Sequence, residues 1–140
     1  MTRLKFEQVE HTADAAVRVY GETLEELFVH AAEALFEIIG PCPRRKEALE
    51  RPLTLEAESP AELLHDWLAE LNYLHQTRHE IYYRFVIGRL SDHRLEASVA
   101  GEPIEAGAHR VDREVKAVTY HRLAVEQVEQ GWRAFVVFDI

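Results

Sequence analysis

The 140-residue sequence has little of what marks several large classes of protein. It contains one cysteine, which excludes an internal disulfide framework and a zinc site built on cysteine pairs. That residue, Cys42, stands between two prolines, and we interpret it as a tolerated thiol. No apolar run approaches the roughly 20 residues that a membrane-spanning helix needs. The first residues, MTRLKFEQVE, also lack the apolar stretch of a signal peptide, so we expect a cytoplasmic protein without membrane association.

Basic residues are in the minority. The sequence has 16 Lys and Arg residues against 25 Asp and Glu residues, which gives a formal net charge of −9. An acidic surface repels phosphate backbones, so stable direct binding of nucleic acid is not expected. A basic protein partner or a bound cation fits this charge better, although acidity also serves simply to keep a domain soluble.

The common catalytic signatures are missing as well. The sequence contains no phosphate-binding glycine-rich loop, no H-E-x-x-H motif, no nucleophile elbow and no Rossmann fingerprint. An enzyme of this length would therefore need another constellation of residues.

Hydrophobic periodicity predicts two helices among several strands. The first helix covers residues 23–40, where Thr23 and Glu26 form a capping box and Gly40 ends the apolar pattern. The second begins after Ser59 with Pro60 in its first turn. The predicted order is two strands, a helix, a strand, a helix and four further strands.

This order predicts one domain over residues 1–140 of the α+β class. We expect a two-layer sandwich in which a mixed β-sheet is covered on one face by the two amphipathic helices. One long alternating segment, residues 115–129, changes the parity of its apolar positions between Val118 and Leu123. That change indicates a bulge or two halves that are covered differently.

Two stretches near the ends of the chain carry acids that merit attention. In EHTAD, His11, Thr12 and Asp14 lie between two predicted strands, where short polar residues commonly hydrogen-bond the main chain of a turn. In FVVFDI, an apolar strand ends on Asp139 and then Ile140. A frayed end in water is the plain explanation for those charges.

Taken together, the two acids suggest a cation site. If the last strand lies near the second, Asp14 and Asp139 meet at one edge of the sheet, and carboxylates ~4 Å apart repel by a few kcal/mol at an effective dielectric near 20. A hard divalent cation removes that repulsion, and a main-chain or terminal oxygen of Ile140 is a natural third ligand. Calcium, or alternatively magnesium, fits oxygen ligands better than zinc, which prefers nitrogen and sulfur.

Other polar residues carry weaker signals. In VKAVTYH, Lys116 by itself is typical of an exposed charge at a strand edge. His75 and His79 have the spacing of two metal ligands on a helix. We prefer a capping interpretation for them, because histidine at a helix end interacts favourably with the helix dipole.

Three stretches together resemble a known family. The segment EHTADAAVRVYGETLEELFVHAAEALFEII, the motif VKAVTYH and the ending DI resemble, in this order, the characteristic motifs of the archease family. The middle of the chain, from about Pro41 to Asp112, matches that family only in its pattern of strands and helices. Ala16 stands where members often carry glycine, which alters the turn without removing a ligand.

The resemblance implies an accessory protein of the GTP-dependent, manganese-requiring RNA ligase that joins RNA ends in tRNA splicing and RNA repair. Archeases promote transfer of guanylate to the active-site histidine of that ligase, support its multiple turnover and widen its choice of nucleotide. They do not carry out the ligation. The implied cation ligands are Asp14, Asp139 and Ile140. The residues expected to contact the partner or to activate it are Lys116, His11, Thr119 and His121.

Two alternatives remain open. A metal-dependent phosphoester or nucleotide hydrolase would hold a catalytic cation with Asp14 and Asp139 and use His11 or His121 as the base. It would turn over its substrate without a partner. A protein-binding module with a purely structural cation would bind the ligase without changing the rate of guanylylation.

Overall fold

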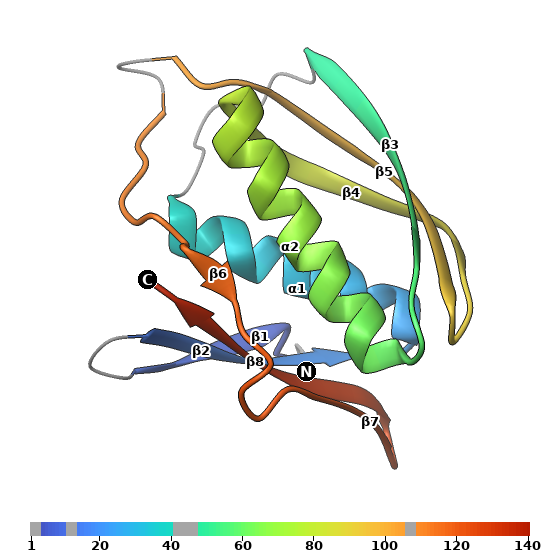
Figure 1. The fold of residues 1–140 in the computed structure, drawn as a ribbon. Helices are drawn as coiled ribbons and strands as arrows, with labels where there is room; N and C mark the ends of the chain where they lie inside the picture. The colour runs from blue at the N-terminus through green and yellow to red at the C-terminus, as the bar shows by residue number, and fades with distance from the viewer. Residues whose placement is uncertain (1–3, 11–13, 41–47, 106–108) are drawn as a thin grey trace.

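The computed structural model describes residues 4–10, 14–40, 48–105 and 109–140. His11, Thr12 and Cys42 lie outside these ranges, so the predictions made for them are not addressed by the structure. The elements, shown in Figure 1, are β1 (Phe6–Glu10), β2 (Asp14–Gly21), α1 (Leu24–Ile39), β3 (Leu49–Glu56), α2 (Pro60–Arg78), β4 (Glu80–Leu90), β5 (Arg94–Pro103), β6 (Ala117–Val118), β7 (Ala124–Val128) and β8 (Gly131–Asp139).

The strands form two sheets in which all the described pairs are antiparallel. Sheet A has the order β1-β2-β8-β6, with β7 also paired to β8, and sheet B has the order β3-β5-β4. Figure 1 shows α1 running between the two sheets and α2 crossing it, and both helices contact strands of both sheets.

The predicted α+β class and its two helices are confirmed, but the strands are divided between two sheets instead of forming one. The reason lies in α1, whose apolar surface is wider than a single stripe. Its buried residues are Leu27, Phe28, Ala31, Ala32, Ala34, Leu35, Phe36, Ile38 and Ile39. A helix that is apolar around so much of its circumference has to be covered on more than one side.

Both helices begin where their capping residues predict. The Thr23 hydroxyl accepts a hydrogen bond from the main-chain N–H of Glu26 at 3.1 Å. At the start of α2, the Ser59 hydroxyl accepts from the N–H of Glu62 at 3.2 Å, and Pro60 occupies the first turn. Within the described ranges, neither helix is long and apolar enough to cross a membrane.

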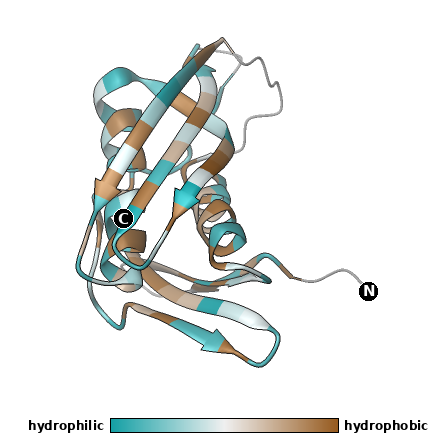
Figure 2. Cartoon of the chain, turned by 90° about the vertical axis from the view of Figure 1, so that its right-hand side faces the viewer, coloured by the Kyte–Doolittle hydropathy of each residue, from teal (hydrophilic) through white to brown (hydrophobic). Residues whose placement is uncertain are grey.

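Alternation along the strands separates the two faces of each sheet. Figure 2 shows hydrophobic and hydrophilic bands that alternate along the strands. In sheet A, Val17 and Val19 of β2 and Val136 and Phe138 of β8 are fully buried and belong to the hydrophobic core. Every second residue of these strands therefore packs toward the helices, and the residues between them project from the opposite face.

The long strand expected over residues 115–129 is two short strands. Both β6 and β7 pair with β8, and a turn separates them. Within this turn Arg122 adopts a left-handed conformation, with φ of 55°, that no strand can continue through. The change of apolar parity in the sequence thus marks two halves that are covered differently.

Candidate cation site at the end of sheet A

The structure brings the two acids of the sequence prediction together. In the antiparallel register of β2 with β8, Asp14 lies opposite Asp139. Directly paired residues of antiparallel strands point to the same face, with their Cβ atoms about 4.5–5.5 Å apart. Because the neighbouring residues Ala15 and Phe138 face the core, the two acids project from the face of sheet A that is opposite the helices.

The oxygen atoms at this strand end fit a hard cation. Asp139 is exposed and Asp14 is half-buried, with its Oδ1 atom shielded from solvent. Within the described residues no three His, Cys, Asp or Glu side chains gather as a metal site, so a cation here would also need main-chain oxygens and water. Ile140, which follows directly, supplies such an oxygen, and Ca²⁺ and Mg²⁺ accept all these donors. Cation binding itself remains a prediction.

The lysine of the second motif adjoins the two acids. The main-chain N–H of Lys116 donates to the carbonyl oxygen of Asp139 at 2.7 Å, and Ala117 lies opposite Asp139 in the β6–β8 register. The side chain of Lys116 is exposed. One strand end therefore carries two carboxylates and one exposed ammonium group on adjoining chain segments.

The rest of the second motif forms the turn after β6. The Thr119 hydroxyl accepts from the main-chain N–H of His121 at 3.2 Å, and the His121 side chain is exposed. Tyr120 stacks on His65 of α2, with ring centroids 3.9 Å apart and planes inclined by 15°. The strand within this motif spans only Ala117–Val118, so Lys116 and Tyr120 lie just outside it on either side.

Three polar residues of α2, which no sequence motif singled out, contact this motif. A ring nitrogen of His65, Nε2, lies 2.8 Å from the carbonyl oxygen of Val118. Asn72 Nδ2 and Gln76 Nε2 donate to the carbonyl oxygen of Val115 at 2.8 and 2.7 Å. Their spacing of seven and eleven residues from His65 places all three on one helix face, which is the signal that the sequence offered.

His79 caps α2 as predicted, but through its main chain, and His75 is buried instead of interacting with the helix dipole. His79 is the C-cap of α2 in a left-handed conformation, and its N–H donates to the carbonyl oxygen of His75. The His75 ring is buried, with Nδ1 2.8 Å from the carbonyl oxygen of Glu80, and burial lowers the pKa of His75.

A partly buried ion pair lies in sheet B. Arg51 donates through Nε and Nη2 to both carboxylate oxygens of Glu80, each at 2.6 Å, and the Tyr82 hydroxyl donates to the same carboxylate at 2.6 Å. The hydrogen bond from Arg51 holds the pKa of Glu80 below its usual value, and burial raises the pKa of Tyr82. All partners are satisfied within the group, so we interpret it as structural.

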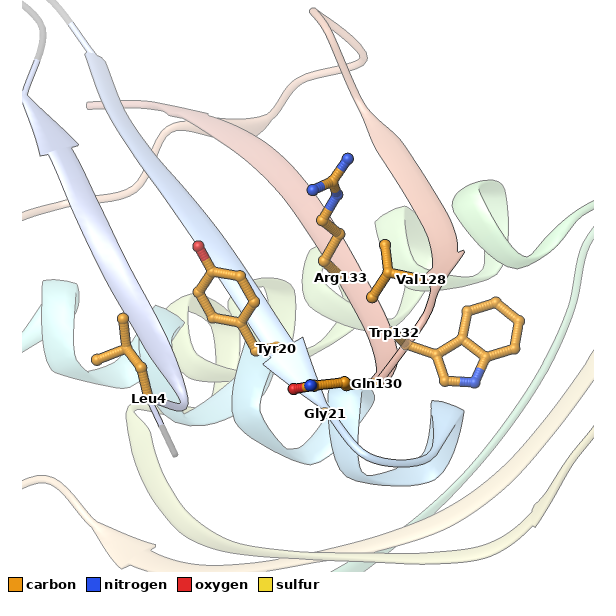
Figure 3. A pocket seen from close by; sticks show the side chains of 7 residues that line it. All are labelled: Leu4, Tyr20, Gly21, Val128, Gln130, Trp132 and Arg133. Atoms are coloured by element: carbon orange, nitrogen blue, oxygen red, sulfur yellow. The ribbon is translucent and has the colours of Figure 1, made fainter. Parts of the chain in front are cut away.

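A pocket lies at the other end of sheet A. It has a volume of about 290 Å³ and is lined by Leu4, Tyr20, Gly21, Val128, Gln130, Trp132 and Arg133 (Figure 3). Gly21 and Trp132 are partners at the end of the β2–β8 register that is remote from the carboxylates. The Tyr20 hydroxyl donates to Glu7 at 2.8 Å, and burial raises the pKa of Tyr20. The pocket is therefore separate from the candidate cation site.

Comparison with known proteins matches almost the whole chain. The model of the archease protein family (MTH1598/TM1083) matches residues 6–140. Protein archease of Methanosarcina mazei is 36% identical, with 97% of this chain and 96% of the relative covered. Protein archease of Methanopyrus kandleri is also 36% identical, with 98% and 100% covered.

Solved structures show the same architecture. The solution structure of protein 1598 of Methanobacterium thermoautotrophicum has a TM-score of 0.80 and 34% identity, and the match covers 97% of this chain and 99% of that one. The crystal structure of an archease from Thermotoga maritima, which is 24% identical, has a TM-score of 0.68 and shares the fold over the full length of both chains. The chain described here belongs to the archease family.

Proposed function

We propose that this protein is a cytoplasmic accessory protein that activates the GTP- and manganese-dependent RNA-splicing ligase. It promotes guanylylation of the ligase's active-site histidine and multiple turnover in tRNA splicing and RNA repair. A divalent cation, Ca²⁺ or alternatively Mg²⁺, binds through Asp14, Asp139 and Ile140. The observation that carries the proposal is the pairing of Asp14 with Asp139 beside Lys116, in a chain that belongs to the archease family.

The arrangement supports a role in contact with a partner. Of the exposed residues, Asp139 ends β8, Lys116 directly precedes β6, and His121 lies in the turn that follows β6. The strands β2 and β8, which carry the two acids, are fixed on their other face by the core. A site on rigid strands is held in one geometry before the partner arrives, which reduces the entropy lost on binding. Net charge of −9 favours a basic surface on that partner.

The residues of the site have separate roles in this proposal. Asp14 and Asp139 hold the cation, which supplies positive charge at the docking surface when it is bound. Lys116 contacts a phosphate or an acidic group of the ligase. Tighter binding of these groups to the guanylylation-competent form of the ligase than to its resting form shifts the ligase toward the competent form.

The test is a guanylylation assay. Purified ligase is incubated with labelled GTP and Mn²⁺, with and without this protein, and the covalent ligase–guanylate adduct is measured over several turnovers. Stimulation is expected for the wild-type protein and for Asp92→Asn, a control that makes the same change at an exposed turn of sheet B. Asp139→Asn and Lys116→Ala are expected to lose stimulation while their thermal unfolding stays cooperative.

Three outcomes contradict the proposal in different ways. Full stimulation by Asp139→Asn removes the role of the carboxylate pair. Binding of the ligase without any change in adduct formation points to a binding module with a structural cation. Release of phosphate from GTP or a phosphoester by the isolated protein, lost in Asp139→Asn, points to a metal-dependent hydrolase.

A further inference from the structure

The segment that carries Lys116 lies at an edge of sheet A. β6 pairs with β8 on one side and is the end of the strand order on the other. Toward β8, the main-chain N–H groups of Lys116 and Thr119 donate to the carbonyl oxygens of Asp139 and Val137 at 2.7 and 3.0 Å. On the open side there is no strand among the described residues, so its carbonyl groups need other donors.

Side chains of α2 supply those donors. Asn72 and Gln76, one helical turn apart, both donate to the carbonyl oxygen of Val115. Two turns earlier, His65 Nε2 lies 2.8 Å from the carbonyl oxygen of Val118. A carbonyl oxygen only accepts, so Nε2 donates in this contact. The other ring nitrogen, Nδ1, lies 2.9 Å from Oδ1 of Asp66. We call His65, Asn72 and Gln76 the α2 clamp.

The stability of the fold does not account for Asn72. Its side chain is buried, with 6% of the residue exposed, and its Oδ1 atom is also buried without a hydrogen-bond partner among the described residues. Burying an unsatisfied amide oxygen costs free energy, and a leucine, which has the same branching but no polar atoms, would avoid that cost. Val115 also keeps the hydrogen bond from Gln76 when Asn72 is removed. The amide therefore fixes where the segment lies at the expense of stability.

We propose that the α2 clamp positions Lys116 for activation of the partner. The clamp holds the carbonyl groups on both sides of Lys116, at Val115 and Val118, while β8 holds its N–H group. These hydrogen bonds fix the main chain of Lys116 next to Asp139. Asn72, Gln76 and His65 are positioning residues, since they act through the main chain of the motif. The position of Lys116 follows from these hydrogen bonds, whereas its effect on the ligase rests on the proposed function.

The test removes the donors and keeps the length of the side chains. In the double variant Asn72→Leu/Gln76→Met, amide hydrogen exchange measured by NMR is expected to become about tenfold faster at Lys116 and Thr119, because the hydrogen bonds that hold this segment are lost. Exchange at Val17 and Val136, which are in the buried centre of sheet A, is expected to change much less than exchange at Lys116. Gln127→Met, the same change at an exposed position of β7, is the matched control.

The ligase assay completes the test. The double variant is expected to stimulate guanylylation about tenfold less at limiting concentration. Its thermal midpoint is expected to fall by a few degrees, because the carbonyl oxygen of Val115 loses both donors, while its unfolding stays cooperative. His65→Leu is also expected to reduce stimulation of guanylylation. His65→Gln retains a hydrogen-bond donor and is expected to stimulate as well as wild type.

The outcomes separate this inference from the proposed function. Unchanged exchange at Lys116, or equally faster exchange throughout sheet A, overturns the clamp. Faster exchange at Lys116 with undiminished stimulation overturns its part in activation. If the wild-type protein does not stimulate the ligase, the proposed function and the activating role of the clamp both fail, while the exchange rates still decide whether α2 holds the segment.

Discussion

Neutralising one acid of the cation site should have opposite effects on stability with and without the cation. We expect Asp139→Asn to unfold at a higher temperature than wild type in a chelating buffer, and at a lower temperature in saturating Ca²⁺. The reason is that Asp14 and Asp139 are two like charges on paired residues, and the same two carboxylates are the ligands when a cation is bound.

The magnitude follows from the register. Cross-strand partners place the two charges about 5 Å apart, and at this separation they repel by about 3 kcal/mol at an effective dielectric of 20 or about 1 kcal/mol in bulk water. Since Asp139 is exposed, the value near 1 kcal/mol applies. For a chain of this length that corresponds to a rise in the thermal midpoint of about 3 °C.

With the cation bound, the wild-type protein is expected to have the higher thermal midpoint of the two. At a Ca²⁺ concentration about 100 times the dissociation constant, the wild-type protein gains about 2.7 kcal/mol, and a variant that has lost a ligand gains much less. The measurement is differential scanning calorimetry of both proteins with EDTA, Ca²⁺ and Mg²⁺ at constant ionic strength. Asp92→Asn controls for the change in net charge, and its midpoint should follow that of wild type in each buffer. A wild-type midpoint that neither Ca²⁺ nor Mg²⁺ raises would falsify the cation site.

Three further predictions concern the fold. Glu80→Gln should lower the free energy of unfolding, measured in urea, by about 2–3 kcal/mol, because it leaves the guanidinium of Arg51 without its carboxylate. The Arg51 side chain is 31% exposed, so the loss should be smaller than for a fully buried ion pair. His75 has a pKa below its ordinary 6.5, so the folded state binds fewer protons than the unfolded chain and stability should fall as the pH drops from about 7.5 to about 5.5; His75→Gln should flatten that dependence. Gly101→Ala should lower the free energy of unfolding by about 1–3 kcal/mol or more, because the new Cβ atom would lie 2.0 Å from the carbonyl oxygen of Ile81. Gly88→Ala should lower the free energy of unfolding by less. A midpoint for Gly101→Ala equal to that of Gly88→Ala would contradict the close approach.

Local signals in the sequence were enough to place the helices. The capping residues Thr23 and Ser59 mark the two helix starts, because their hydroxyls satisfy N–H groups of the first turn within a few residues. The parity change between Val118 and Leu123 indicated a break, although it could not decide between a bulge and two halves that are covered differently. Such features depend on neighbours in sequence, which is why pattern alone recovers them.

Features that depend on distant residues were harder to predict. The pairing of Asp14 with Asp139 needed the assumption that β2 lies beside β8, which no local pattern supplies. The division into two sheets depends on the breadth of the apolar surface of α1. The α2 clamp was overlooked because a single histidine, asparagine or glutamine on a helix is ordinary, and only the position of the carbonyl groups facing them gives the spacing a meaning.

The central place of β8 in sheet A has a consequence for synthesis. β2, β6 and β7 all pair with this strand, whereas sheet B is complete once β5 has been made. As the chain leaves the ribosome, sheet B and the helices can associate early, while β1 and β2 wait as a hairpin with an unpaired edge. Closing that gap joins segments more than a hundred residues apart, so we expect slow maturation and a need for protection against aggregation in the nascent protein.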